Sequence, residues 1–269
     1  MDIAQISDFH VTAPGALAFG RVDTNQALAN AVSVLNGLVP QPALVIGSGD
    51  LTQHGREDEY RALSGILAEL KSPFLPLLGN HDRRAAFRGA FGGAAWTFGP
   101  ADFIQCEVTL GDLRILVLDT VREGSDEPEF CEARLAWLRA RLADPRPTLL
   151  AMHHPPFACG VGWVDAADPR WSEPFGDIIA GAPGIVRILC GHVHRAIFRN
   201  WRGAPISTAP ASAYQVALSL SPDALPALSL EAPGFQLHRW DGRDLVTYGA
   251  AFAGFGERFD LAASPVAET

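Results

Sequence analysis

The feature that most constrains the fold of this 269-residue chain is a repeated pattern, in which a short apolar segment ends in Gly, Pro or His and polar side chains. Such segments are typical of buried strands that end in turns. Between them, apolar residues recur at helical spacing. Strands that alternate with helices indicate an α/β protein. The expected strands are 3–6, 43–46, 74–78, 149–152 and 186–190, and the expected helices are 25–38 with Thr24 as N-cap, 57–70 and 132–142.

Two further strand patterns suggest mixed sheets. A β-hairpin is expected over 103–118, turning at Gly111-Asp112, and closing strands are expected over 235–240 and 244–248. The chain has no internal repeat and no linker long enough to divide it, and its best loop candidate is 219–233. We therefore expect a single domain over 1–269, with 219–269 as a C-terminal extension of strands and loop.

The composition of the chain disfavours some classes of binding partner. Twenty-one Lys and Arg against thirty Asp and Glu give a net charge of −9, which disfavours binding to a nucleic acid polymer or an anionic membrane. No apolar run approaches the roughly 20 residues that span a bilayer. The four cysteines lie far apart, and no signal peptide is recognisable, so we expect free thiols and a cytoplasmic location.

Polar residues gather at the carboxyl ends of the expected strands, where open α/β sheets bind their ligands. They are acids, amides and imidazoles, the mixed oxygen and nitrogen donors that suit a first-row transition metal. Asp8 and His10 lie two residues apart in a segment expected to be extended, so they should point to the same side, and His192 and His194 repeat this spacing. The candidates are Asp8, His10, Asp50, Asn80, His81, His153, His154, His192 and His194.

The number of candidates favours two metal ions over one. When His81 and His154 are set aside, because each adjoins a better candidate, seven donors remain. Seven donors are too many for one tetrahedral ion, but they suit two ions with open positions if one carboxylate bridges them. Asp50 is the expected bridge, since Gly49 before it permits a close approach of the backbone.

Five motifs carry a family resemblance: Asp8-x-His10, Gly49-Asp50, Gly79-Asn80-His81-Asp82, His153-His154-Pro155-Pro156 and Gly191-His192-Val193-His194. In this order they resemble the calcineurin-like metallophosphoesterases, and the branch that contains class III cyclic nucleotide phosphodiesterases and glycerophosphodiesterases most closely. The stretches 20–24, 82–87 and 152–157 support that branch.

The resemblance implies a four-layer αββα sandwich, in which two mixed sheets pack face to face between helices. It assigns Asp8, His10, Asp50 and His194 to one metal ion, and Asp50, Asn80, His153 and His192 to the other. Members of the family use manganese, iron, zinc or cobalt, and the motifs do not choose among them.

The expected activity is that of a dinuclear-metal phosphodiesterase, which hydrolyses small phosphodiesters through a hydroxide that bridges the ions. A 3′,5′-cyclic nucleotide is the first-choice substrate, and a glycerophosphodiester is the alternative. A non-enzyme alternative is a catalytically silent metal-binding scaffold. His81 either protonates the leaving group or hydrogen-bonds the phosphate, and Asn80, His81 and His154 are expected to bind substrate.

Residues outside the candidate ligand set also have expected roles. Substrate choice is assigned to the loops near Phe19, 157–168 and Tyr214. Asp82 is expected to close the turn or to support a neighbouring group, and His54 and His238 are expected to be surface or structural histidines. The aromatic residues Tyr248, Phe252, Phe255 and Phe259 are a candidate homodimer contact.

Overall fold

The computed structural model describes residues 1–93, 103–165, 168–221 and 223–252. The first sheet has the order β13-β12-β1-β2-β3, and the second has the order β4-β5-β6-β7-β9-β8. The strands of the first sheet are β1 (Asp2–Ile6), β2 (Leu44–Ser48), β3 (Phe74–Leu77), β12 (Gly234–Trp240) and β13 (Leu245–Ala251). Those of the second are β4 (Cys106–Leu110), β5 (Leu113–Val117), β6 (Thr148–Ala151), β7 (Ile185–Cys190), β8 (Ile197–Trp201) and β9 (Ala204–Thr208).

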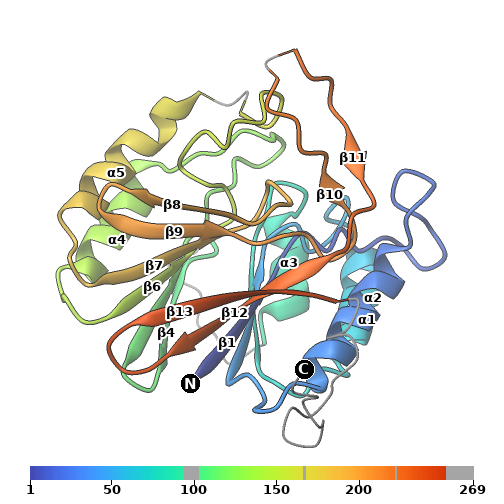
Figure 1. The fold of residues 1–269 in the computed structure, drawn as a ribbon, viewed down its shortest axis with the longest axis horizontal. Helices are drawn as coiled ribbons and strands as arrows, with labels where there is room; N and C mark the ends of the chain where they lie inside the picture. The colour runs from blue at the N-terminus through green and yellow to red at the C-terminus, as the bar shows by residue number, and fades with distance from the viewer. Residues whose placement is uncertain (94–102, 166–167, 222, 253–269) are drawn as a thin grey trace, which may run out of the picture.

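The helices lie outside the two sheets (Figure 1). They are α1 (Thr24–Asn36), α2 (Glu57–Leu67), α3 (Arg84–Phe91), α4 (Glu132–Leu142) and α5 (Glu173–Ala180), with a short 3₁₀ helix at Pro169–Ser172 before α5. A separate two-stranded hairpin, β10 (Gln215–Val216) and β11 (Leu228–Ser229), extends away from the body of the molecule (Figure 1).

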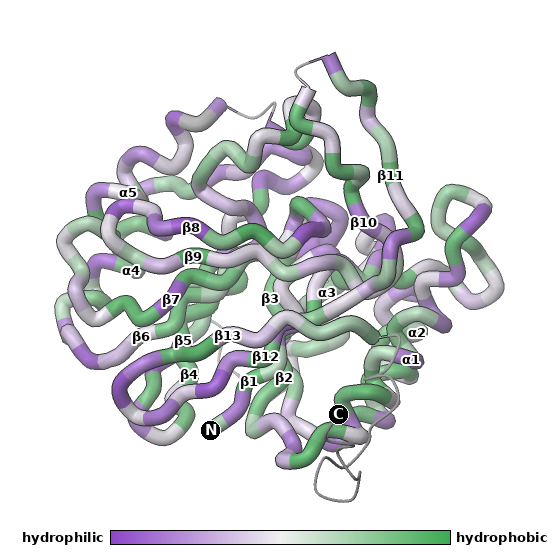
Figure 2. The backbone as a smooth tube through the Cα atoms, in the orientation of Figure 1, coloured by the Kyte–Doolittle hydropathy of each residue, from purple (hydrophilic) through white to green (hydrophobic). Residues whose placement is uncertain are grey.

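Three apolar layers hold these elements together. One layer joins α1, α2 and α3 to the first sheet, through residues such as Leu28, Leu63 and Ala4. A second joins α4 and α5 to the other sheet, and the third fills the space between the sheets with residues such as Ile46 and Ile115. In Figure 2 the inner strands β2, β5 and β6 are largely hydrophobic in colour. The expected four-layer αββα architecture is therefore confirmed.

Helix α1 shows how local sequence sets an element. Leu28, Ala31 and Leu35 form a buried stripe at helical spacing. The expected N-cap, Thr24, is wrong: Thr24 is the first helical residue, and the carboxylate of Asp23 accepts the N-cap hydrogen bond from the Gln26 amide at 2.9 Å. The Thr24 hydroxyl instead donates to the carbonyl of His10 at 2.8 Å, which ties the helix to the loop after β1.

All the expected strands and helices are present, with shifts of a few residues at their ends. Helices α3 and α5 and the β8–β9 hairpin are additional to the elements expected from the sequence. The segment expected to be a loop, 219–233, contains β11, which pairs with β10. Strand β12 pairs antiparallel with β1, so the C-terminal strands extend the first sheet.

The C-terminal aromatic residues lie in different environments. Phe252 is buried, and its ring stacks on Phe235 with centroids 4.9 Å apart. Tyr248 is half exposed, whereas Phe255 and Phe259 lie outside the described residues. The four cysteines are free thiols. Within the described ranges, no helix has the length and apolar character needed to cross a membrane.

Candidate metal centre

The seven candidate metal ligands meet where the carboxyl ends of strands from both sheets come together. The loops after β1, β2 and β3 carry four of them, and the loops after β6 and β7 carry the other three. Every one is buried except His192, which is partly buried. From the first sheet come Asp8, His10, Asp50 and Asn80, and from the second come His153, His192 and His194.

One group of four donors comprises Asp8, His10, Asp50 and His194, whose ligand atoms all lie within 4.8 Å of one another. His10 Nε2 is 3.1 Å from His194 Nε2 and 3.6 Å from Asp50 Oδ2. His194 Nε2 is 3.4 Å from Asp8 Oδ1. These are the four residues that the family resemblance assigns to one metal ion.

The second group surrounds the other oxygen of Asp50. Asp50 Oδ1 lies 3.4 Å from His153 Nε2. Asn80 Oδ1 lies 3.1 Å from His153 Nε2 and 3.1 Å from His192 Nδ1. The two oxygens of Asp50 thus face the two groups, which is the arrangement that a bridging carboxylate requires.

The backbone around these donors is strained. Five of the seven have a positive φ between 47° and 71°, a left-handed conformation that L-residues with side chains rarely adopt. The expectation of an extended segment at Asp8 and His10 is therefore wrong, because tight left-handed turns aim these side chains. The five are Asp8, His10, Asp50, His192 and His194.

Gly49 lets the two sheets approach at this point. It has a φ of +93°, and a Cβ on it would lie 2.3 Å from His153 Nδ1. Only glycine leaves room for the imidazole, so Gly49 and the strain at Asp50 together place a carboxylate of the first sheet beside a histidine of the second.

Carbonyl groups fix the tautomers of two histidines. His153 Nδ1 donates to the carbonyl of Ser48 at 2.9 Å, and His194 Nδ1 donates to the carbonyl of Tyr214 at 3.0 Å. Because a carbonyl only accepts, each Nδ1 carries the proton and each Nε2 is free to donate a lone pair inward. This arrangement is typical of metal-binding histidines.

A carboxylate orients Asn80 in the same way. Asn80 Nδ2 donates to Asp126 Oδ1 at 3.2 Å. A carboxylate only accepts, so the amide nitrogen faces Asp126 and the amide oxygen faces His153 and His192.

Burial and neighbouring charges shift the pKa values of Asp50, His153 and His192. Burial alone would raise the pKa of Asp50, but the imidazoles of His153 and His81 hold it well below its ordinary value. Burial opposes the charged form of His153, yet Asp50 raises the pKa of His153 to about 9. Burial and the neighbouring His153 lower the pKa of His192 to about 3. Without metal, His192 is therefore a neutral donor, whereas His153 must lose a proton to bind a cation.

Several observations show that the donors fit metal ions. Asp8 Oδ2 is buried and makes no hydrogen bond to any described residue. Among the described residues, histidines form all the ion pairs recorded for Asp8 and Asp50, with no Lys or Arg beside them. Metal–ligand bonds of about 2.0–2.2 Å place ligand atoms roughly 3 to 3.5 Å apart, close to the separations seen here. Buried carboxylates of this kind call for cations.

His81 lies beside the candidate metal ligands. Its backbone amide donates to Asp50 Oδ1 at 3.0 Å, and its Nδ1 donates to the carbonyl of Gln53 at 2.8 Å. Burial would lower the pKa of His81, but the charge of Asp50 and the Gln53 carbonyl raise it above its ordinary value. His81 can therefore hold a proton near neutral pH.

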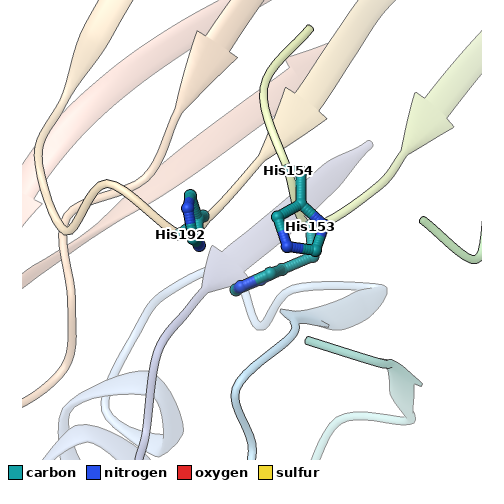
Figure 3. A group of neighbouring side chains, drawn as sticks. All are labelled: His153, His154 and His192. Carbon is teal, nitrogen blue, oxygen red and sulfur yellow. The ribbon is translucent and has the colours of Figure 1, made fainter. Parts of the chain in front are cut away.

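His154 lies next to His153 and His192, and ligand atoms of the three rings lie within 4.8 Å of one another (Figure 3). Its Nδ1 is 2.8 Å from the hydroxyl of Thr120, and its buried Nε2 has no hydrogen-bond partner among the described residues. His154 also borders a small cavity of about 100 Å³ with Phe157 and Trp171.

A larger cavity of about 530 Å³ opens above the candidate ligands. Its walls include three aromatic residues from loops that were assigned to substrate choice, Phe19, Trp163 and Tyr214. The ring of Tyr214 stacks on that of His10, with ring centroids 5.4 Å apart. The rings of Phe19 and Tyr214 pack in a T-shaped arrangement, with centroids 5.5 Å apart. The hairpin residues Pro226 to Leu228 close one side.

Sequence reasoning missed the groups that support the donors. The carbonyls of Ser48 and Tyr214 act through the backbone, so side-chain chemistry gives no signal for them. Thr120 and Asp126 belong to the segment between β5 and α4, which carries no motif. The sequence signal for a supporting residue in that segment is charge, as at Asp126.

Residues outside the ligand set have structural roles. Asp82 accepts hydrogen bonds from the amides of Leu51, Thr52 and Gly79 and from the hydroxyls of Thr52 and Tyr60, which is the supporting role expected. His238 is buried and hydrogen-bonded to Gln5 and Thr247, whereas His54 is exposed and pairs with Glu59.

Comparison with known proteins gives a consistent result. A model of the calcineurin-like phosphoesterase family matches residues 1–196. The chain is 32% identical to a probable glycerophosphodiester phosphodiesterase of Arcobacter nitrofigilis, over 94% of each chain. It is 33% identical to a probable cyclic nucleotide phosphodiesterase of Rhodopseudomonas palustris, over 97% of this chain and 96% of that one.

A solved structure shares the fold. The dimetal phosphatase from Danio rerio aligns with a TM-score of 0.66 over 94% of this chain and 96% of that chain. The sequence identity is 17%, so this likeness supports the fold alone.

Proposed function

The chain belongs to the calcineurin-like phosphoesterase family, and on that premise we propose that it is a dinuclear-metal phosphodiesterase of small phosphodiesters. The observation that carries this proposal is the meeting of seven oxygen and nitrogen donors from two sheets at the floor of a cavity of about 530 Å³. Pockets of roughly 300–1,000 Å³ hold small ligands, and a nucleic acid polymer would not be buried in one.

We propose two sets of metal ligands that share Asp50. Asp8, His10 and His194 complete the first set, and Asn80, His153 and His192 complete the second. The mixed oxygen and nitrogen donors suit manganese, iron, zinc or cobalt. When bound, such ions lower the pKa of water and offset the negative charge of the phosphate.

His81 is the proposed acid for the leaving group. Since its Nδ1 donates to the Gln53 carbonyl, the protonated ring has Nε2–H available to donate to the departing alkoxide. The side chains of Asn80 and His154 are proposed to bind substrate, supported by the position of Asn80 on the cavity wall and by the unpartnered Nε2 of His154.

A 3′,5′-cyclic nucleotide is the proposed substrate. The cavity offers the rings of Phe19, Trp163 and Tyr214, and aromatic faces stack well on a nucleobase. The similarity to a probable cyclic nucleotide phosphodiesterase supports this choice.

A glycerophosphodiester is the second candidate, and two acidic side chains favour it. Asp126 and Glu127 line the same cavity. Their negative charge suits an alcohol moiety that carries a cation, such as ethanolamine. The similarity to a probable glycerophosphodiester phosphodiesterase points the same way.

The location and organisation of the protein are also proposals. Four free cysteines fit a reducing compartment and support a cytoplasmic location. The pairing of β12 with β1 supports a single domain, because the C-terminal part of the chain then shares a sheet with the strand before Asp8. The exposed Tyr248 remains a candidate homodimer contact.

The test is a substrate panel with manganese-loaded protein: cyclic AMP, cyclic GMP, glycerophosphoethanolamine and a chromogenic diester. Turnover of the cyclic nucleotides with a kcat/KM at least tenfold above the other diesters supports the first choice. Preferential turnover of glycerophosphoethanolamine would replace it with the second. Two bound metal ions without hydrolysis of any ester would indicate a silent metal-binding scaffold instead.

A further inference from the structure

The apolar layer between the two sheets contains a buried glutamine, Gln5 of β1. Its side-chain Nε2 donates to the Ser48 hydroxyl of β2 at 2.9 Å and to the carbonyl of Cys190 in β7 at 2.8 Å. Since β1 and β2 belong to the first sheet and β7 to the second, this amide hydrogen-bonds the two sheets to each other.

The orientation of the Gln5 amide is fixed from both ends. The carbonyl of Cys190 only accepts, so Nε2 must face it. On the other side Gln5 Oε1 accepts from His238 Nε2 at 3.3 Å, and His238 Nδ1 accepts from the Thr247 hydroxyl at 2.8 Å. A continuous chain of hydrogen bonds therefore runs from β13 through β12 and β1 to β7.

Both contacts of Gln5 Nε2 lie directly behind the candidate metal ligands. Ser48 precedes Asp50 by two residues, and its carbonyl accepts the Nδ1–H of His153 at 2.9 Å. Cys190 precedes His192 by two residues, at the end of β7. The amide thus joins the ends of the two strands, β2 and β7, that lead into loops carrying donors of opposite sheets.

We propose that Gln5 is a positioning residue for the dinuclear centre, whose amide fixes the offset between the sheets so that donors of the first sheet meet those of the second. This inference rests on the proposed metal centre. The pairs that depend on the offset are Asp50 with His153 and Asp8 with His194, at 3.4 Å each.

Apolar contacts and hydrogen bonds restrict the offset between the sheets to different degrees. Apolar side chains pack without strong directionality, so an apolar layer alone tolerates small displacements. Metal sites demand ligand distances within about 0.2 Å. A hydrogen bond between buried groups is directional and restricts the donor–acceptor distance to about 2.7–3.2 Å, which limits such displacements.

Gln236 provides a matched control. It lies opposite Gln5 in the β1–β12 pair, and it is equally buried. It also hydrogen-bonds across the sheets, because its Nε2 donates to the carbonyl of Thr208 at 2.8 Å and its Oε1 accepts from the Ser207 hydroxyl at 2.9 Å. Ser207 and Thr208 are not adjacent in sequence to any proposed ligand, and Thr208 reaches the ligand loop only indirectly, through its pairing with Cys190 and a hydrogen bond from its hydroxyl to the carbonyl of Arg195. Gln236 therefore shares the cross-sheet contact of Gln5 at one step further from the ligands.

The experiment titrates metal-free full-length protein with cobalt(II) and follows the visible absorption bands of the bound ion. Gln5→Met removes the amide at similar volume, and Gln236→Met is the control. We expect cobalt affinity to fall by about 10- to 100-fold in Gln5→Met, the range known for residues that orient metal ligands, and by less than about threefold in Gln236→Met. Equal losses in the two variants, or none in Gln5→Met, would overturn the positioning role.

A double variant separates positioning from stability. Gln5→Met leaves His238 Nε2 buried without a hydrogen-bond partner, so His238→Leu in the same chain should recover stability. If Gln5 positions the ligands, the double variant should still bind cobalt more weakly than His238→Leu alone. Recovery of cobalt affinity together with stability would contradict the positioning role. If the unaltered protein fails to bind two cobalt ions, the proposed function is wrong, and this outcome is distinct from failure of the Gln5 proposal.

Discussion

Replacement of His238 should flatten the dependence of stability on pH. His238 is fully buried in β12, remote in sequence from the ligand motifs, and hydrogen-bonded through both ring nitrogens. Burial, with a smaller contribution from Arg187, lowers the pKa of His238 to about 3. In the unfolded chain the pKa of a histidine is about 6.5.

The sign and size of the effect follow from these two values. Between pH 6.5 and 3 the unfolded chain binds a proton at His238 that the folded protein does not bind, so stability falls as the pH falls. At pH 7 the contribution is almost fully present. Each pH unit below 6.5 removes about 1.4 kcal/mol, which gives a loss of about 2 kcal/mol between pH 7 and pH 5.

Urea unfolding, followed by tryptophan fluorescence, measures this loss in metal-free protein at pH 7 and pH 5. His238→Gln keeps a neutral side chain at both pH values, while the histidines of the metal centre remain unchanged. The unaltered protein should lose about 2 kcal/mol more than the variant over this interval. Equal losses in the two proteins would refute the assignment of His238 as a buried neutral histidine.

Three other substitutions test separate parts of the structure. Gly49→Ala should destabilise by about 1–3 kcal/mol, since its Cβ would clash with His153, whereas Gly89→Ala meets no neighbour and should cost nothing; urea unfolding compares them. His81→Ala should lower kcat by about 10²–10⁴ on esters with poor leaving groups and much less on activated esters, and equal losses would exclude the acid role. Asp82→Ala leaves several buried donors unpaired and should lower the free energy of unfolding by about 3 kcal/mol, and a loss under about 1 kcal/mol would show that water replaces the carboxylate.

The sequence predicts the central strands and the longer helices well, because an element that buries one face carries a clear periodic pattern of apolar residues. Helix α4 has the predicted bounds, 132–142. Helix α5 was missed because Glu173–Ala180 is only eight residues long and follows directly on a 3₁₀ helix, so little helical periodicity can accumulate. The β8–β9 hairpin was missed because β8 lies at a sheet edge with Phe198 exposed, which breaks the apolar pattern.

The candidate site was predictable as a set of side chains but not as a geometry. Strand-end motifs identified the seven donors that the structure brings together. The left-handed backbone at Asp8 and His10 could not be inferred, because only a few per cent of residues with side chains have a positive φ, and Asp and His still adopt other conformations far more often. The supporting contacts were also hidden, since they depend on backbone carbonyls and on pairings between sheets, such as Gln5 with Cys190.

The central claim is that donors from both sheets hold two adjacent cations, and crystallography of manganese-soaked protein with anomalous scattering tests it most directly. We predict two anomalous peaks about 3.5–4 Å apart, with Asp50 between them and the remaining six side chains divided three to each peak. A single peak, or peaks away from these side chains, would contradict the account.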